Sequence, residues 1–532
     1  MQQAEFWLAK FPSAVVARLR AEIGERTATL LRLMAFGRYL NTRMAITVVT
    51  TSQEDYAFDI FEALNTTGQP LTAFETFRPK VIETEGIAQF HYTASARHLA
   101  TIEAFLDRFD KADDRQKATS SILIPFALLD NGGRLEARLA AQRAYLRTTY
   151  ERLPDLAAKR SFTKSLATTS TFLKNGWQAP AGEVANPSPG GKPLNDPEAG
   201  FCFEAMRSLK HDITVAPMVR FYAEADGQPG TPATLAYEGA IKAMTAFSMM
   251  WRAAKGGTAS IDNRYRTLVS GGTDAPHPLV RRQADGRPTR MPTLAELQSS
   301  LMAMLKRAKL DTREAWVAAA AQRAIYSENA LAARFLLLVA MHNSVPDGDT
   351  GLITGDGRGN LDLLTPAEWY SRTTESIEHV APQSKGKSDW PATIYDDSRV
   401  VHQIGNLLLL PRLENNEGAN HSWERKRMLL GIFAAEGKAQ AQERLTAAQK
   451  KGITLGKKAE AIALENHVLP LCRSAAGYAG AWDAAFISLR SQRLAELAWD
   501  RMAGWLGAKP ADTGAGAGGG AAAGAQDAAP AA

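Results

Sequence analysis

Residues 376–427 read SIEHVAPQSKGKSDWPATIYDDSRVVHQIGNLLLLPRLENNEGANHSWERKR, and this stretch decides the fold of the C-terminal third of the chain. SIEHV predicts a short strand that ends in a Glu-His pair, and QIGNLLLL predicts a second strand after a long polar loop. PRLENNEGAN is rich in turn residues, and HSWERKRMLLGIFAAEG predicts a helix with a basic first turn. The order strand, loop, strand and helix is typical of a ββα-metal arrangement.

The polar residues of this stretch suit the hydrolysis of a phosphodiester, which needs an activated water molecule and stabilisation of the leaving oxygen. A neutral imidazole titrates near working pH, so His379 can take a proton from water. Glu378 and Asn415 can offer oxygen atoms to a hard cation such as Mg²⁺. The amide of Asn406 is placed to fix the long loop by hydrogen bonds to the backbone. Lys426 is placed to hold a phosphate.

Each of these residues also has a structural interpretation. A histidine beside a glutamate is usually a structural or surface pair, Asn406 can simply end a strand, and Asn415 can simply make a turn. The basic residues around 425–427 can form an exposed helix face. The functional interpretation therefore depends on EHVAPQ, HQIGNL, NNEGAN and the basic helix occurring together within about fifty residues.

IEHVAPQS, HQIGNLLLLPRLENNEGAN and the following Trp and Lys resemble the C-terminal nuclease domain of GmrSD-type, modification-dependent restriction endonucleases. These domains belong to the broader HNH (His-Me finger) nucleases, and the resemblance covers roughly residues 330–430. It implies that the catalytic residues are His379, the general base, Asn406, the central structural asparagine, and Asn415, which lies on the metal side. The implied ligands of Mg²⁺ or Mn²⁺ are Glu378 and Asn415. The expected DNA contacts are Lys426, Arg425, Arg427, His402 and Asn420.

A second resemblance lies upstream, in FDIFEALNTTGQPLTAFETFRPKVIE (58–83), which is similar to the later part of the ParB-like N-terminal domain of the same family. Asn65 and Gly68 fit a tight turn, and Thr72 and Glu75 have the spacing of a capping box. The family's Asp-Gly-Gln-Gln-Arg motif, associated with nucleotide binding and hydrolysis, does not occur in this sequence. We therefore expect either a truncated chain or a separate polypeptide that carries the missing segment.

Hydrophobic periodicity predicts helices over most of the remaining chain. Residues 5–40 predict one or two helices, MAITVVTT (44–51) predicts a buried strand, and residues 95–250 predict helices interrupted by a loop over 175–200. Helices are expected again from 294, including ENALAARFLLLVAMHN. Residues 256–292 read as irregular and form either a solvated loop or a phosphate-contacting surface. The arginines of that stretch are Arg264, Arg266, Arg281, Arg282, Arg287 and Arg290.

The composition is that of a soluble globular protein, and its slight basic excess is compatible with a polyanionic partner without demonstrating one. The 532 residues are 45% hydrophobic and 22% charged, with a formal charge of +6. Only two cysteines occur, Cys202 and Cys472, which excludes a zinc ribbon or a disulfide framework. The N-terminus does not resemble a secretory signal, and no apolar run approaches the roughly 20 residues that cross a bilayer. We therefore expect a cytoplasmic protein with no membrane partner.

These observations predict an α+β fold, predominantly helical, with four regions. They are a remnant of a ParB-like domain (1–90), a helical middle region (91–310), an HNH-type nuclease domain (311–506) and a disordered Ala/Gly-rich tail (507–532). The expected function is metal-dependent cleavage of foreign, modified DNA in a bacterial restriction or anti-phage system. Two alternatives remain open. One is a non-catalytic DNA-binding or regulatory subunit, and the other is an RNA-directed nuclease or toxin.

Overall fold

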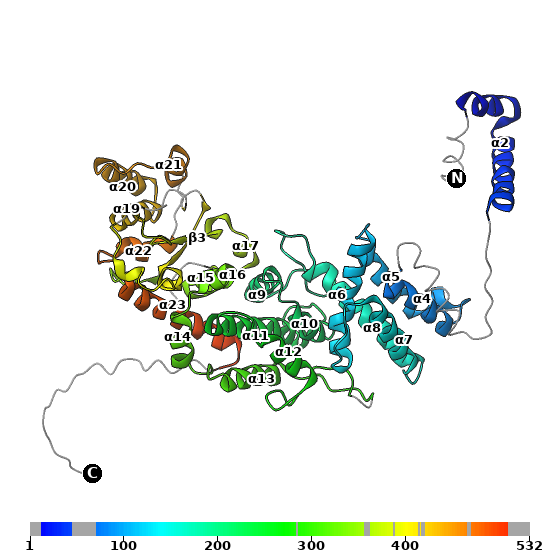
Figure 1. Ribbon diagram of the computed structural model, residues 1–532, viewed down its shortest axis with the longest axis horizontal. Helices are drawn as coiled ribbons and strands as arrows, with labels where there is room; N and C mark the ends of the chain where they lie inside the picture. Colours follow the sequence, from blue (N-terminus) through cyan, green and yellow to red (C-terminus); the bar gives the residue numbers. More distant parts are fainter. Residues whose placement is uncertain are drawn as a thin grey trace, which may run out of the picture. The chain divides into compact units, whose positions relative to one another are not determined.

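The structure of the protein is a computed structural model of the 532-residue chain (Figure 1). It describes residues 12–44, 71–283, 286–355, 362–386, 389–412, 415, 421–464 and 470–508. The chain divides into two compact units, Met1–Leu71 and Thr72–Ala532. The strand predicted over 44–51, the turn at Asn65 and Gly68, and the tail beyond 508 lie outside the described residues, apart from Met44.

The described part of the first unit is the helix α2 (Ser13–Arg43), which confirms the helical pattern predicted there. Gly24 interrupts the helical backbone inside α2, with φ 67° and ψ 156°. Glycine adopts this positive φ without the steric cost that a side chain would bring. The helical parts before and after Gly24 therefore agree with the prediction of one or two helices in this region.

The second unit is predominantly helical, as predicted. Its first helices are α4 (Ala73–Glu85), α5 (Ala94–Leu106), α6 (Ala112–Asn131), α7 (Leu139–Glu151), α8 (Leu156–Phe172), α9 (Pro197–Ser208), α10 (Val215–Tyr222), α11 (Pro232–Lys255), α12 (Ile261–Ser270) and α13 (Leu294–Arg307). The later helices are α14 (Arg313–Ala321), α15 (Ile325–Glu328), α16 (Ala330–Met341), α17 (Pro366–Trp369), α19 (Trp423–Phe433), α20 (Lys438–Lys450), α21 (Lys457–Leu464), α22 (Arg473–Gly477) and α23 (Ala484–Trp505). Short helical turns, labelled η, connect several of them.

In the described part of this unit, four short strands accompany these helices. They are β1 (Val345–Pro346), β2 (Ile353–Thr354), β3 (Ser376–His379) and β4 (Leu407–Leu410). β1 pairs with β2, and β3 pairs with β4, both antiparallel. The fold is therefore helical with two small hairpins, in agreement with the predicted α+β class.

The predicted capping box opens α4. The Thr72 hydroxyl accepts a hydrogen bond from the backbone N–H of Glu75 (3.2 Å), and the Glu75 carboxylate accepts one from the N–H of Thr72 (2.7 Å). The two bonds satisfy two N–H groups that a helix start leaves without partners. The boundary predicted at Thr72 is thus confirmed.

The stretch 256–292, predicted to be irregular, contains a helix. α12 covers DNRYRTLV and buries Ile261, Tyr265, Leu268 and Val269, which are spaced along one helical face. Because polar residues separate these few apolar positions, the pattern was too sparse to recognise. Three arginines of the stretch are held in ion pairs: Arg264 with Asp274, Arg282 with Asp130 and Arg290 with Glu296.

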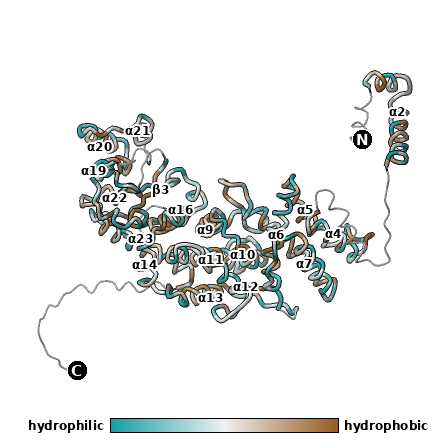
Figure 2. Tube along the Cα trace, viewed as in Figure 1, coloured by the Kyte–Doolittle hydropathy of each residue, from teal (hydrophilic) through white to brown (hydrophobic). Residues whose placement is uncertain are grey.

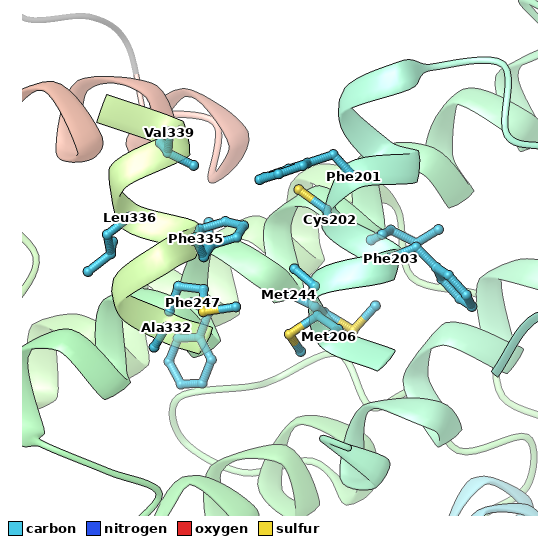
Figure 3. Close-up of a cluster of buried hydrophobic side chains, with 14 of the residues drawn as sticks. Phe201, Cys202, Phe203, Met206, Met244, Phe247, Ala332, Phe335, Leu336 and Val339 are labelled. Carbon is cyan, nitrogen blue, oxygen red and sulfur yellow. The ribbon is translucent and has the colours of Figure 1, made fainter. Parts of the chain in front are cut away.

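The largest part of the core surrounds α11, which is buried over most of its length. α9, α16 and α23 pack against it. In Figure 3, Phe201 of α9 faces Phe335 of α16, and the two rings stack with their centroids 5.3 Å apart. In Figure 2, hydrophobic and hydrophilic residues alternate along most helices, as expected where each helix buries one face.

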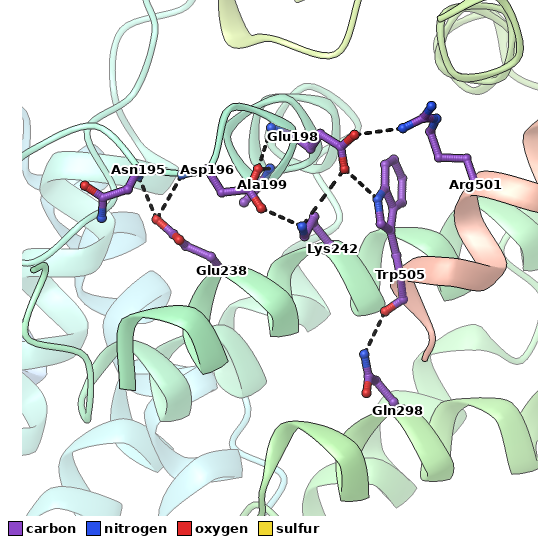
Figure 4. A network of polar contacts seen from close by, with 9 residues as sticks. All are labelled: Asn195, Asp196, Glu198, Ala199, Glu238, Lys242, Gln298, Arg501 and Trp505. Atoms are coloured by element: carbon purple, nitrogen blue, oxygen red, sulfur yellow. Dashed lines mark hydrogen bonds and ion pairs between the residues drawn. The ribbon is translucent and has the colours of Figure 1, made fainter. Parts of the chain in front are cut away.

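Helix α23 connects this core with the β3–β4 hairpin. At its C-terminal end, Glu198 of α9 accepts hydrogen bonds from Arg501 (2.8 Å) and from the Trp505 indole (2.9 Å). Gln298 of α13 donates to the Trp505 carbonyl (3.0 Å), so this end of α23 is tied to two helices of the core (Figure 4). Among the helices that the structure describes, none is both long and apolar enough to cross a membrane.

Candidate active site

The β3–β4 hairpin carries the predicted site residues. In its register Glu378 pairs with Leu408 and His379 with Leu407, and all four leucines of β4 are buried. The next described helix along the chain is α19. The predicted order of strand, loop, strand and helix is therefore confirmed at the level of secondary structure.

Asn406 holds the start of the loop that follows His379. Its amide nitrogen donates to the carbonyls of Ala381 (2.8 Å) and Val401 (2.8 Å), and its amide oxygen accepts from the N–H of Ala381 (2.8 Å). The indole of Trp482 donates to the same oxygen (3.1 Å). Asn406 is completely buried. Its side chain thus forms the hydrogen bonds to the loop that the sequence predicts. Ala381, which makes two of them, lies two residues after His379.

The helix α23 supports Asn406 from behind, which the sequence did not indicate. A Cβ atom on Gly405 would lie 2.0 Å from the carbonyl oxygen of Ile487. Because only glycine permits this close approach, the Ser491 hydroxyl can accept from the N–H of Gly405 (2.9 Å) and Arg490 can donate to its carbonyl (2.6 Å). Burial lowers the pKa of Arg490 to about 10, so the guanidinium remains charged at neutral pH.

His379 lies at the end of β3 and is buried, with 6% of its surface exposed. Its Nε2 is 3.3 Å from Nδ1 of His402, and the ring of Tyr326 packs edge-on against it with 4.4 Å between centroids. Burial lowers the pKa of His379 to about 3, and the positive fields of His402 and Lys426 contribute in the same direction. The imidazole is therefore neutral near pH 7 and has a lone pair that can accept a proton.

Glu378 and Lys426 form a buried ion pair beside His379. The Lys426 amine lies 2.5 Å from Oε1 of Glu378 and donates to the carbonyl of His379 (2.8 Å), and its side chain is only 3% exposed. Burial raises the pKa of Glu378, and the ammonium opposes this rise. Burial also lowers the pKa of Lys426. A phosphate contact by Lys426, predicted from the sequence, would therefore require this pair to open.

Asn415, Arg425 and Arg427 are the remaining predicted residues that the structure describes. Asn415 donates from its amide to the Ser376 hydroxyl (2.9 Å) and to the Ile377 carbonyl (3.2 Å), at the start of β3 rather than at its end. Arg425 and Arg427 are half-buried on α19. Asn420 lies outside the described residues.

The two predicted cation ligands are both engaged by other groups. Mg²⁺ prefers oxygen ligands, which Glu378 and Asn415 could supply, but the Glu378 carboxylate is bound to Lys426. Within the described ranges, no three His, Cys, Asp or Glu side chains come together as a group that could hold a metal ion. The Asn415 amide nitrogen is likewise engaged, by the Ser376 hydroxyl and the Ile377 carbonyl.

Comparison with known families supports a nuclease in this part of the chain. Residues 353–497 match the family described as GmrSD restriction endonucleases, C-terminal domain. The matched segment contains β3, β4 and α19, and ends within α23. It supports the GmrSD-type family predicted from the sequence, a nuclease activity in restriction, and DNA as the substrate that such a family implies. The comparison with curated proteins gave no match.

Proposed function

We propose that this protein is an HNH-type endonuclease that hydrolyses phosphodiester bonds of foreign, modified DNA in a bacterial restriction or anti-phage system. The observation that carries the proposal is the burial of His379 at the end of β3, directly before a loop that Asn406 fixes by hydrogen bonds. Both residues lie in the segment that matches the restriction endonuclease family. In this proposal, the ββα element is the catalytic unit.

His379 acts as the general base. A neutral imidazole nitrogen takes a proton from a water molecule, and the resulting hydroxide attacks the phosphorus atom as the 3′ or 5′ oxygen leaves. The same burial that keeps His379 neutral also makes it a weak base in the free protein. A phosphodiester anion beside the ring opposes this effect, because negative charge favours the imidazolium form. DNA binding therefore raises the basicity of His379 where the reaction needs it.

The proposed DNA contacts are those of α19 and the neighbouring loops. Arg425 and Arg427 lie at its first turns, and a guanidinium binds a phosphate through two parallel hydrogen bonds. His402 and Asn420 complete the proposed contacts. Lys426 would join them only after leaving Glu378.

Dependence on Mg²⁺ or Mn²⁺ is part of the proposal. Oε1 of Glu378 binds the Lys426 ammonium, so the cation would be held by the other carboxylate oxygen or after this ion pair opens. Asn415 is the second proposed ligand, through its amide oxygen, because the amide nitrogen that donates to Ser376 has no lone pair for a cation. We attribute no separate step of the reaction to the cation.

The Glu378–Lys426 pair also favours a second candidate function. A protein in which an internal ammonium permanently holds the acidic residue of the site would be a non-catalytic DNA-binding or regulatory subunit. For either function we propose that residues 1–90 are part of a ParB-like domain and that a separate polypeptide carries a nucleotide-binding segment. The protein is proposed to act in the cytoplasm.

A panel of substrates tests the proposal. Purified protein and His379→Ala are incubated with glucosylated, hydroxymethylated and plain duplex DNA, and with structured RNA, in Mg²⁺ or Mn²⁺. The proposal predicts cleavage of modified DNA by the wild type and none by the variant. Equal cleavage by both proteins would contradict the assignment of His379. Binding without cleavage would support the regulatory subunit, and cleavage of RNA alone would support an RNA-directed nuclease.

A further inference from the structure

Three aromatic rings, those of Tyr326, His379 and His402, form a cluster at the candidate active site. The Tyr326 ring meets His379 edge-on, with centroids 4.4 Å apart and an angle of 86°, and stacks parallel on His402, with centroids 5.7 Å apart and an angle of 9°. The two histidine rings are perpendicular, at 85°, and their Nε2 and Nδ1 atoms lie 3.3 Å apart. Edge-on and parallel contacts of this kind are favourable arrangements of aromatic rings.

Tyr326 comes from outside the segment that matches the nuclease family. It belongs to the short helix α15, whose Ile325 is buried and whose Glu328 forms an ion pair with Arg323. α15 packs against the turn η7 (Val400–His402), which carries His402. The ring is thus held against the two histidines by a separate element of the chain.

The ring of Tyr326, rather than its hydroxyl group, makes these contacts. Among the residues that the structure describes, the hydroxyl has no hydrogen-bond partner, whereas the ring contacts both imidazoles. Packing is therefore the property of Tyr326 that can affect His379.

The hydrogen bond between the two histidines couples their tautomers, and either ring can be its donor. A neutral imidazole has one N–H and one lone pair. When Nε2–H of His379 donates to Nδ1 of His402, the lone pair of His379 is on Nδ1, and His402 carries its own hydrogen on Nε2. Only this direction leaves a lone pair of His379 free to accept a proton from water, because in the reverse direction the Nε2 lone pair of His379 accepts from His402 and its Nδ1 carries the hydrogen.

We infer that Tyr326 is a positioning residue for water activation. Its ring holds His402 in place, and Nδ1 of His402 then fixes the Nε2–H tautomer of His379. This inference rests on the proposed function, in which His379 is the base. It adds a residue that the family match does not contain. It also gives His402 a role within the protein in addition to the DNA contact expected from the sequence.

The test compares the full-length protein with Tyr326→Leu, Tyr326→Phe and His402→Phe. The ¹⁵N resonances of His379 are measured in protein labelled only at histidine, and they are assigned by their absence in His379→Gln. We expect the wild type and Tyr326→Phe to show a single Nε2–H tautomer. In Tyr326→Leu and His402→Phe, both nitrogens should shift towards the averaged values of a free imidazole. Tyr145→Leu, a half-buried tyrosine of α7, is the control and should leave these resonances unchanged.

Kinetics give a second measure. Tyr326→Leu should lower kcat for DNA cleavage by roughly 10- to 100-fold, the range typical of residues that orient a reacting group, with little change in KM. Unchanged His379 resonances in both Tyr326→Leu and His402→Phe would overturn the inference. A tautomer lost equally in Tyr326→Phe would also overturn it, because the hydroxyl would then be responsible. If the wild type cleaves no nucleic acid, the proposed function fails while the resonances still decide the role of Tyr326.

Discussion

Replacing Asn406 by alanine should destabilise the folded protein strongly. The side chain is completely buried, and it makes four hydrogen bonds, two to Ala381, one to Val401 and one to Trp482. Alanine leaves all four partner groups buried without a replacement. At about 1 kcal/mol for each lost bond, the free energy of unfolding should fall by about 4 kcal/mol.

The assay is urea denaturation followed by tryptophan fluorescence, with the free energy taken from the midpoint and slope. Asn406→Asp should be at least as damaging, because a carboxylate oxygen would then face the carbonyls of Ala381 and Val401. The control is Asn263→Ala, an exposed asparagine of α12, which should change stability by less than about 0.5 kcal/mol. A loss below about 1 kcal/mol for Asn406→Ala would refute the hydrogen-bond argument.

Three further predictions concern packing, pH and metal. Gly405→Ala should lower the free energy of unfolding by about 1–3 kcal/mol, because the added Cβ meets the Ile487 carbonyl. Gly431→Ala on α19 is the control, since a Cβ there has open space and should not destabilise the protein. Equal urea midpoints for the two variants would contradict the close approach at Gly405. Burial and the adjacent Arg252 lower the pKa of His211 from 6.5 to about 3, so below pH 6.5 the unfolded chain takes a proton that the folded protein does not. The free energy of unfolding should therefore fall by about 2 kcal/mol between pH 6.5 and pH 5. The same fall in a His211→Gln variant would disprove the role of His211. Chelation with EDTA should abolish DNA cleavage and added Mg²⁺ or Mn²⁺ should restore it, while full activity in EDTA would argue against a required cation.

Local patterns in the sequence predicted individual helices and strands well. The Thr72 capping box, β3, β4 and α19 each depend on neighbours within a few positions, and the structure confirms all of them. The hydrogen bonds of Asn406 were also anticipated, because a buried amide beside a long loop has few other partners. The helix α12 was missed because polar residues dominate its local pattern and leave only a sparse apolar face.

Contacts between distant segments could not be predicted in this way. Arg490 donates to the carbonyl of Gly405, although the two residues are 85 positions apart in the sequence. Tyr326 contacts His379 from a helix that comes earlier in the chain. The partner of Lys426 was missed because exposure of a basic helix face was assumed, whereas the helix turns this lysine inward to Glu378. Whether Lys426 is exposed or paired with Glu378 depends on how α19 packs against the hairpin, which the local sequence does not reveal.

The most direct test of His379 as the base is its effect on the rate of the chemical step. Single-turnover cleavage of modified duplex DNA is measured with excess enzyme, for the wild type and for His379→Ala, after far-UV circular dichroism shows that both are folded. Loss of a general base should lower the rate constant by roughly 10²- to 10⁴-fold, with DNA binding retained. Equal rate constants for the two folded proteins would contradict the account.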